Sequence, residues 1–274
     1  MKNPVCPVCG GASAASPRLI ECRGCGLAFE TEKRFCPPAY EPGLEEGIYG
    51  SAKKALFREA LDFLDRTFPD RGRLLDIGCA GGELLRAAAA RGWLAEGVEL
   101  DPALAAKALA LGLEVHTRPV EEAALAGGAY SAVTVFEVFS QMERPAAAAA
   151  ELLRLLKPGG VMYARDFNAG FHLTLYRLGE TGLFGLPGVR PWVFHNMNFR
   201  ARTLRLMLQR SGFRDIKIRN SRPTAGDPYR TGGALGGFLT GALKVLYYWL
   251  AQALWFITFG RVYAGSALIV TARK

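Results

Sequence analysis

The segment Arg73–Glu83, with the sequence RLLDIGCAGGE, constrains the fold of this chain more than any other stretch. Its apolar run of Leu74, Leu75 and Ile77 is typical of a buried parallel strand, and the glycines that follow allow a sharp turn into a helix. A second apolar strand, about twenty residues later, ends at the acidic Glu99, where a carboxylate can accept hydrogen bonds from both hydroxyls of a ribose. Together the two motifs predict a nucleoside site in an α/β domain.

The charges around the glycine loop favour a cationic ligand. Asp76 precedes the loop and Glu83 follows it, so a pyrophosphate placed there would face two carboxylates. The loop also lacks the spacings GxGxxG and GxxxxGK[ST], which are typical of dinucleotide and triphosphate sites. S-adenosylmethionine suits the loop better, because it carries an amine and a sulfonium together with one small carboxylate and a ribose.

The segment LLDIGCAGG resembles the first motif of the class I S-adenosylmethionine-dependent methyltransferases, and LLKPGG at 155–160 looks like the turn before their fifth strand. The resemblance covers 53–220 and the last strand. It implies an α/β fold with a Rossmann-like, mostly parallel seven-stranded sheet and helices on both faces, and it implies methyl transfer from S-adenosylmethionine. The residues that we expect to bind this cofactor are Asp76, Gly78, Cys79, Ala80, Gly81, Glu99, Leu100, Val120, Glu121 and Phe136.

The apolar pattern along the chain agrees with such a sheet. An amphipathic helix is predicted over 53–67, and βα alternation follows it, as expected for parallel strands covered by helices. The predicted strands are 74–78, 94–100, 114–117, 132–138 and 161–167, and the predicted helices between them are 83–91, 102–111 and 145–156.

Four cysteines near the N-terminus have the spacing of a metal site. CPVCG and CRGCG are two C-x-x-C knuckles twelve residues apart. The opening MKNPVCPVCG has no apolar secretory segment, so we expect a cytoplasmic protein with reduced thiols. Little βαβ pattern surrounds the knuckles, which disfavours a redox C-x-x-C motif. We therefore predict a structural zinc held by Cys6, Cys9, Cys22 and Cys25.

These motifs divide the chain into parts. We expect a zinc ribbon over 1–36, a linker or lid over 37–52, and a methyltransferase domain over 53–274. The domain would contain an apolar helical insertion at about 221–265. Tyr40 and Tyr49 are candidates to close over the cofactor, and Cys36 is left outside the metal set.

The catalytic candidates are Gln141 and His195. The segment FEVFSQMERP resembles a family pattern in which a histidine often occupies the position of Gln141, and a glutamine cannot accept a proton. His195 precedes a predicted helix where relatives contact substrate, so it is a candidate base. The alternative is that His195 is a packed, hydrogen-bonded histidine without a catalytic role. Methyl transfer gains much of its rate from positioning the reactants, so it does not require a strong base.

The stretch Ala234–Phe259 is long and apolar enough to span a membrane. We expect it not to do so, because the predicted strands on either side of it pair in one sheet. Polar residues at helical spacing, Thr240, Lys244, Tyr248 and Gln252, form a narrow stripe on this helix. A helix of this kind lies in a membrane interface or docks on a hydrophobic partner, which includes a second copy of the chain. Both interpretations stay open.

The net charge of +9 and an arginine-rich stretch over 190–230 predict an anionic partner. We expect a small-molecule methyl acceptor of the lipid-linked glycan or isoprenoid type, reached by an enzyme that is peripheral to the inner membrane face. The alternatives are an RNA methyltransferase and a non-catalytic, cofactor-binding scaffold protein. We do not expect nucleic acid as a partner, because the sequence shows no aromatic and basic RNA-binding module.

Overall fold

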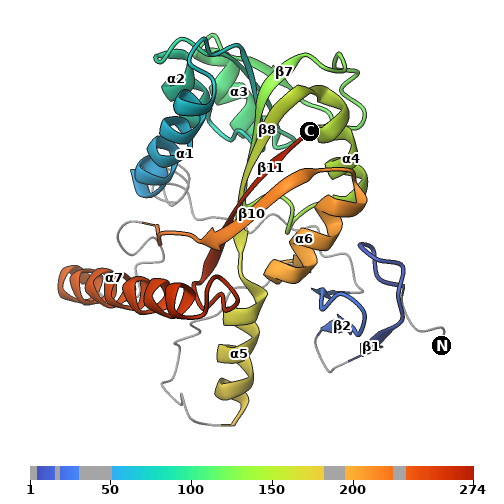
Figure 1. The fold of residues 1–274 in the computed structure, drawn as a ribbon. Coiled ribbons are helices and arrows are strands. Elements are labelled where there is room, and N and C mark those ends of the chain that lie inside the picture. The colour runs from blue at the N-terminus through green and yellow to red at the C-terminus, as the bar shows by residue number, and fades with distance from the viewer. Residues whose placement is uncertain (1–4, 16–18, 31–50, 182–194, 225–232) are drawn as a thin grey trace.

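A seven-stranded sheet forms the centre of the molecule (Figure 1). The computed structural model describes residues 5–15, 19–30, 51–181, 195–224 and 233–274. The strand order is β10-β11-β8-β7-β4-β5-β6; β11 is antiparallel to both of its neighbours, and the other pairs are parallel. The predicted fold class is confirmed. The strands are β4 (Arg73–Ile77), β5 (Leu94–Val98), β6 (Glu114–His116), β7 (Tyr130–Phe136), β8 (Leu156–Phe167), β10 (Arg214–Asn220) and β11 (Ala267–Arg273).

Successive residues of the central strands supply the cores of opposite layers, because side chains alternate across a sheet. Leu74 packs with the buried faces of α1 and α2, whereas Leu75 packs with those of α4 and α6. Helices therefore cover both faces, as predicted. The helices are α1 (Lys54–Thr67), which follows the short helix η2 (Ser51–Lys53), α2 (Glu83–Ala89), α3 (Pro102–Ala110), α4 (Pro145–Leu155), α5 (Ala169–Glu180), α6 (Ala201–Arg210) and α7 (Gly233–Ile257).

Most strand boundaries differ from the sequence prediction by one or two residues, and the start of β8 differs by five. β5 ends at Val98 rather than at residue 100, so Glu99 lies immediately beyond the strand. β8 begins at Leu156 rather than at residue 161, because Leu156 already pairs with Tyr130 ahead of an irregularity in the ladder. The earlier end of β5 matters for function, since residues just past the strand ends line the ligand site of an open α/β sheet.

The N-terminal cysteine-rich unit shares a sheet with the main domain. Its strands β1 (Ser13–Ala15), β2 (Ile20–Cys22) and β3 (Ala28–Phe29) are antiparallel, and β3 pairs in turn with β9 (Met197–Asn198). Thr203 Oγ1, in α6, also donates a hydrogen bond to the carbonyl of Cys25 at 2.8 Å. The unit is thus attached through both β9 and α6. Cys36, Tyr40 and Tyr49 lie outside the described residues.

Helix α7 is inserted between β10 and β11, which confirms the predicted antiparallel pairing of the two strands. It lies beyond the end of β10 and beside α5 (Figure 1), where the Tyr247 ring is 5.0 Å from that of Phe171. The buried Asn220 amide joins the helix to the sheet: its Nδ2 donates to the carbonyl of Ala251 at 3.1 Å, and its Oδ1 accepts from the backbone N–H of Gly265 at 3.0 Å. No helix in the described part of the chain is both long and apolar enough to cross a membrane.

The polar stripe of α7 faces the protein, and the apolar side chains face outward. Tyr248 and Gln252 are half-buried; Gln252 donates to the Tyr248 hydroxyl at 2.9 Å and accepts from Asn220. Lys244 is half-buried as well, and the side chain of Thr240 lies outside the described part. Outward-facing residues include Leu243, Trp249 and Phe256, which are 64%, 62% and 77% exposed. An exposed apolar surface of this kind marks a contact with a membrane or with another protein surface.

Replacing Asn220 with alanine should loosen the attachment of α7. The change leaves the buried N–H of Gly265 without its acceptor, and an unsatisfied buried group of this kind costs about 1–3 kcal/mol. We expect the free energy of unfolding in urea to fall by about 2 kcal/mol. Asn196→Ala is the matched control, because within the described residues the side chain of Asn196 makes one long contact, of 3.5 Å to the carbonyl of Gln141. Equal stabilities of the two variants would contradict this role of Asn220.

Candidate functional site

The glycine loop between β4 and α2 has a backbone that side chains would obstruct. Gly78 has φ of +71°, and a Cβ atom there would lie 2.4 Å from Cγ2 of Val138. Gly82 has φ of +86°, and its Cβ would lie 2.2 Å from Cδ1 of Leu113. Glycine therefore fits both positions where other residues would not, and the loop can pass tightly from strand to helix.

Carboxylates surround this loop. Asp76 is buried at the end of β4, where its Oδ1 accepts a hydrogen bond from Thr134 Oγ1 at 2.6 Å. Burial raises the pKa of the Asp76 carboxyl to about 7, and the negative charges of Glu99 and Glu83 act in the same direction. Three acidic side chains thus act on one another at the loop, which suits a cationic ligand, as the sequence indicated.

Glu99 lies directly over the loop. One of its carboxylate oxygens accepts from the backbone N–H of Ala80 at 2.9 Å, and the other accepts from that of Asp101 at 2.8 Å. The backbone N–H of Glu99 donates to the carbonyl of His116, at the end of β6. The structure therefore brings the predicted ribose-binding carboxylate and the glycine loop together at the carboxyl ends of neighbouring strands.

The other predicted cofactor residues border the same region. Cys79 is buried in the loop, and burial raises the pKa of its thiol, so the thiol stays protonated at neutral pH. Val120 is buried in one apolar cluster with Ile77 and Val98. Leu100 is exposed, Gly81 and Glu121 are half-buried, and Phe136 packs edge-on against Phe57 with ring centroids 5.1 Å apart. The contacts of these residues with a cofactor stay predictions.

Sequence reasoning missed a buried cluster of charges beside the loop. Lys53 Nζ lies 2.8 Å from Glu137 Oε2, and the other oxygen of Glu137 pairs with Arg165. Burial lowers the pKa of Lys53 to about 7, and the positive charge of Arg165 lowers it further; Asp76 and Asp166 act in the opposite direction. The cluster links the start of α1 to the ends of β7 and β8. No motif marks it, because these residues are far apart in the sequence.

The two catalytic candidates lie in one group of side chains next to this cluster. Gln141 Nε2 donates to the carbonyl of Glu137 at 2.8 Å, and Ser140 Oγ lies 3.3 Å from His195 Nδ1. Asp166 Oδ2 fixes the turn by accepting from the backbone N–H of Ser140 at 2.9 Å. The structure thus gathers residues from the ends of β7 and β8 and from the segment before β9.

His195 has the environment of a neutral side chain. Burial lowers the pKa of its imidazole to about 4, and the charge of Lys53 acts in the same direction. Its ring lies 5.0 Å from that of Phe167, and its backbone N–H donates to Asn198 Oδ1 at 3.1 Å. At neutral pH the imidazole is uncharged and is a weak base. The surroundings of His195 fit two roles: a packed residue without a part in catalysis, and a neutral hydrogen-bonding group beside the methyl acceptor.

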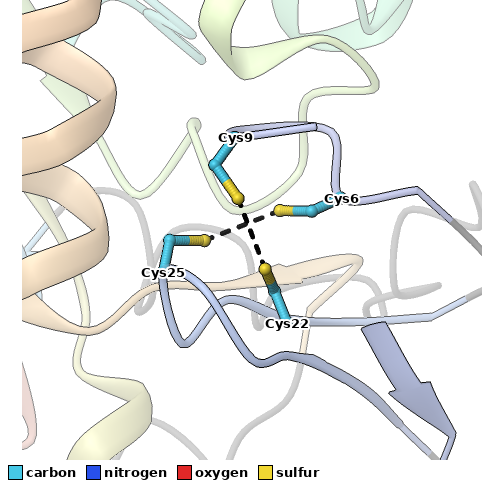
Figure 2. Close-up of side chains that lie close together, drawn as sticks. All are labelled: Cys6, Cys9, Cys22 and Cys25. Atoms are coloured by element: carbon cyan, nitrogen blue, oxygen red, sulfur yellow. Dashed lines mark hydrogen bonds between the residues drawn. The ribbon is translucent and has the colours of Figure 1, made fainter. Parts of the chain in front are cut away.

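The four N-terminal cysteines can hold a metal ion. Figure 2 shows their side chains converging from two loops, and their Sγ atoms all lie within 4.8 Å of one another. The Sγ atoms of Cys6 and Cys25 are 3.6 Å apart, and those of Cys9 and Cys22 are 3.3 Å apart. A tetrahedral zinc with Zn–S bonds of about 2.3 Å places its sulfurs about 3.8 Å apart, so the cluster fits this ion with small adjustments.

A second group with metal-ligand side chains contains Glu96, Glu114 and His116, of which Glu96 and His116 already pair with protein groups. Glu96 lies between Arg73, at 2.5 Å, and His116 Nε2, at 2.9 Å. Hydrogen bonds from Arg73 and His116 lower the pKa of the Glu96 carboxyl against the effect of its burial. The pairing of Glu96 with Arg73 and His116 is therefore explained as a hydrogen-bonded ion-pair network across β4, β5 and β6.

A family model described as a methyltransferase domain matches residues 52–218. Ubiquinone biosynthesis O-methyltransferase from Aromatoleum aromaticum is 35% identical over 124 residues, which are 42% of this chain and 53% of that protein. The enzyme of the same name from Dechloromonas aromatica is 33% identical over 116 residues, which are 39% of this chain and 50% of that protein. The chain spans about half the length of these curated relatives.

Solved structures agree on the fold. A SAM-dependent methyltransferase from Archaeoglobus fulgidus superposes with a TM-score of 0.54 at 19% identity, covering 84% of this chain and 97% of that chain. An S-adenosylmethionine-dependent methyltransferase from Mesorhizobium loti gives 0.52 at 19% identity, covering 85% and 100%. At this level of identity the likeness concerns the arrangement of the sheet and its helices.

Proposed function

We propose that this chain, which belongs to the methyltransferase domain family, transfers a methyl group from S-adenosylmethionine to a small-molecule acceptor. The observation that carries the proposal is the set of carboxylates Asp76, Glu83 and Glu99 around the glycine loop. These charges disfavour a pyrophosphate and favour an ammonium and a sulfonium.

Each predicted residue would contact a different part of the cofactor or the acceptor. Asp76 and the amides of the loop would hold the methionine part of the cofactor, Glu99 would accept hydrogen bonds from the ribose hydroxyls, and Leu100 and Glu121 would border the adenine. S-adenosylmethionine supplies an electrophilic methyl group. The group around Ser140, Gln141 and His195 would face the acceptor. Holding two reactants in line supplies much of the rate of such a displacement, so few groups need to exchange protons.

The acceptor, we further propose, is a membrane-associated molecule of the lipid-linked glycan or isoprenoid type. Because β11 is antiparallel to β8, Ala267 at the start of β11 pairs with Phe167 at the end of β8. Helix α5 follows the end of β8, and α7 precedes the start of β11, so both helices lie at the carboxyl ends of the parallel strands, where the glycine loop also lies. The exposed apolar face of α7 is therefore next to the acceptor side. The curated relatives bear names of enzymes that act in ubiquinone biosynthesis, which supports a small-molecule acceptor.

Calorimetric titration with S-adenosylhomocysteine tests cofactor binding. Glu99→Ala should weaken binding at least about tenfold, because charged hydrogen bonds to the ribose are worth about 1.5–3 kcal/mol each. The control is Glu122→Ala, which removes an exposed carboxylate near the site. If the intact protein does not bind, or if the two variants bind equally well, the proposed cofactor site is wrong.

The cysteine cluster, we propose, holds a structural zinc. Four thiolates fill a tetrahedral shell and leave no open position, so the ion would stabilise the N-terminal unit and take no part in methyl transfer. The Sγ separations of the cluster support this assignment.

Metal analysis of the purified protein should therefore find one zinc per chain. Replacing Cys22 and Cys25 together with serine should abolish binding, since two of the four thiolates are lost. Cys79→Ser is the matched control, because this cysteine is buried outside the cluster. Full zinc in the double variant would rule out the four-cysteine site.

Vesicle flotation tests the role of α7. The intact protein should float with vesicles that contain phosphatidylglycerol, and a variant with Trp249→Glu and Phe256→Glu should stay at the bottom, because both side chains are exposed on the outer face of the helix. The control pair Leu94→Glu and Leu111→Glu changes exposed residues elsewhere. If the intact protein never floats and elutes as a dimer that the α7 variant makes monomeric, the face is a contact between two copies.

A further inference from the structure

A cavity of about 420 Å³ lies between the start of α5, the start of α6 and the turn that leads from α7 into β11. Four arginines line it: Arg200, Arg202, Arg205 and Arg261. The remaining lining residues are Asn168, Gly170, Ala201, Gly260 and Tyr263. No lining residue is acidic. We call this cavity the arginine pocket.

The positive charge of the arginine pocket is mostly uncompensated. Arg200 has one carboxylate, that of Glu21, at 3.8 Å, and Arg205 uses Nη1 to donate to the carbonyl of Ile216. Arg202 and Arg261 are exposed, and neither forms an ion pair with a carboxylate of the described residues. A cluster of like charges of this density is unfavourable unless an anion accompanies it.

The frame of the pocket is rigid. Asn168 is buried, and its Nδ2 donates to the carbonyls of Tyr263 and Gly265 at 2.9 and 2.8 Å. Its Oδ1 accepts from the N–H of Gly170 at 3.0 Å. One amide side chain therefore ties the start of α5 to the turn after α7. The arginines project from a fixed frame, so they can bind an anion with little loss of backbone entropy.

The number and type of side chains indicate the ligand. Guanidinium groups bind phosphate through paired hydrogen bonds, and several of them together match a group with three or more acceptor oxygens. A single carboxylate would satisfy only one arginine. The pocket thus favours a phosphate or a diphosphate.

The rim of the pocket indicates what carries the phosphate. Phe259, next to the lining residue Gly260, is 89% exposed, and Val262, next to Arg261, is 41% exposed. The exposed apolar face of α7 continues from there through Phe256 and Ile257. A ligand that fits both surfaces has a charged phosphate at one end and an apolar chain at the other.

We infer that the arginine pocket binds the phosphate group of an anionic lipid whose apolar chain lies along the outer face of α7. The inference rests on one part of the proposed function, the contact of α7 with a membrane, and is independent of methyl transfer. The pocket lies between elements at the edge of the sheet that carries the glycine loop, so a lipid bound there would be on the acceptor side.

The test is binding of the full chain to phosphatidylcholine vesicles that contain phosphatidic acid. A variant with Arg202→Ala and Arg261→Ala should bind about 30-fold more weakly, because each basic residue at an anionic surface contributes about a fivefold gain in affinity. The control pair Arg214→Ala and Lys217→Ala removes the same charge from exposed positions on β10. Inorganic diphosphate should compete with the vesicles for the intact protein and not for the pocket variant.

Three results would overturn the inference. Equal losses of vesicle affinity in the pocket variant and in the control pair would show a general attraction between charges. Tight binding of diphosphate without binding to vesicles would show a soluble phosphate ligand. A vesicle affinity that changes with the α7 variant and not with the pocket variant would show a membrane contact without phosphate recognition. Titration of the same proteins with S-adenosylhomocysteine reports separately on the proposed function, because none of these arginines is placed in the cofactor site.

Discussion

The antiparallel ladder of β8, β11 and β10 determines where the functional parts of this molecule lie. Because β11 enters the sheet between two strands of the opposite direction, β8 and β10 end where β11 begins. The connections at these ends, α5 and α7, are thereby placed at the edge that also carries the glycine loop after β4. The arginine pocket is a consequence of this pairing, since its lining comes from the starts of α5 and α6 and from the turn after α7. The carboxylates of the glycine loop lie at the same ends of the strands, but the parallel strands β4 and β5 place them there.

The glycine loop, Glu99 and the cysteine knuckles could be predicted because each is a local pattern with a physical reason. A tight turn requires glycine at Gly78 and Gly82, and four thiolates need two short loops. The βα alternation likewise predicted the sheet and both covering layers. Strand ends were less accurate, as for β8, because Leu156 extends the strand through a partner that only the tertiary structure supplies.

The charged cluster and the orientation of α7 could not be predicted in this way. Lys53, Glu137 and Arg165 have no common motif, and their pairing depends on how α1 begins against the ends of two strands. The polar stripe of α7 was visible in the sequence, but its direction was not. The stripe faces inward because Asn220, buried at the end of β10, takes Gln252 as a partner and so turns the polar side of the helix toward the sheet.

The pairing of β3 with β9 has a consequence for the order in which this molecule opens. β9 has two residues, and its ladder partner belongs to the cysteine-rich unit. Backbone hydrogen bonds therefore join 196–198 to a segment that is more than 160 positions away in the chain, such as the bond that the N–H of Glu30 donates to the carbonyl of Asn196. The same segment is also held by the central domain, through the bond from the N–H of Met197 to the carbonyl of Ser140. Opening of the N-terminal unit alone would therefore remove the hydrogen bonds on one side of this segment and leave those on the other, and amide exchange in the two sets would differ accordingly.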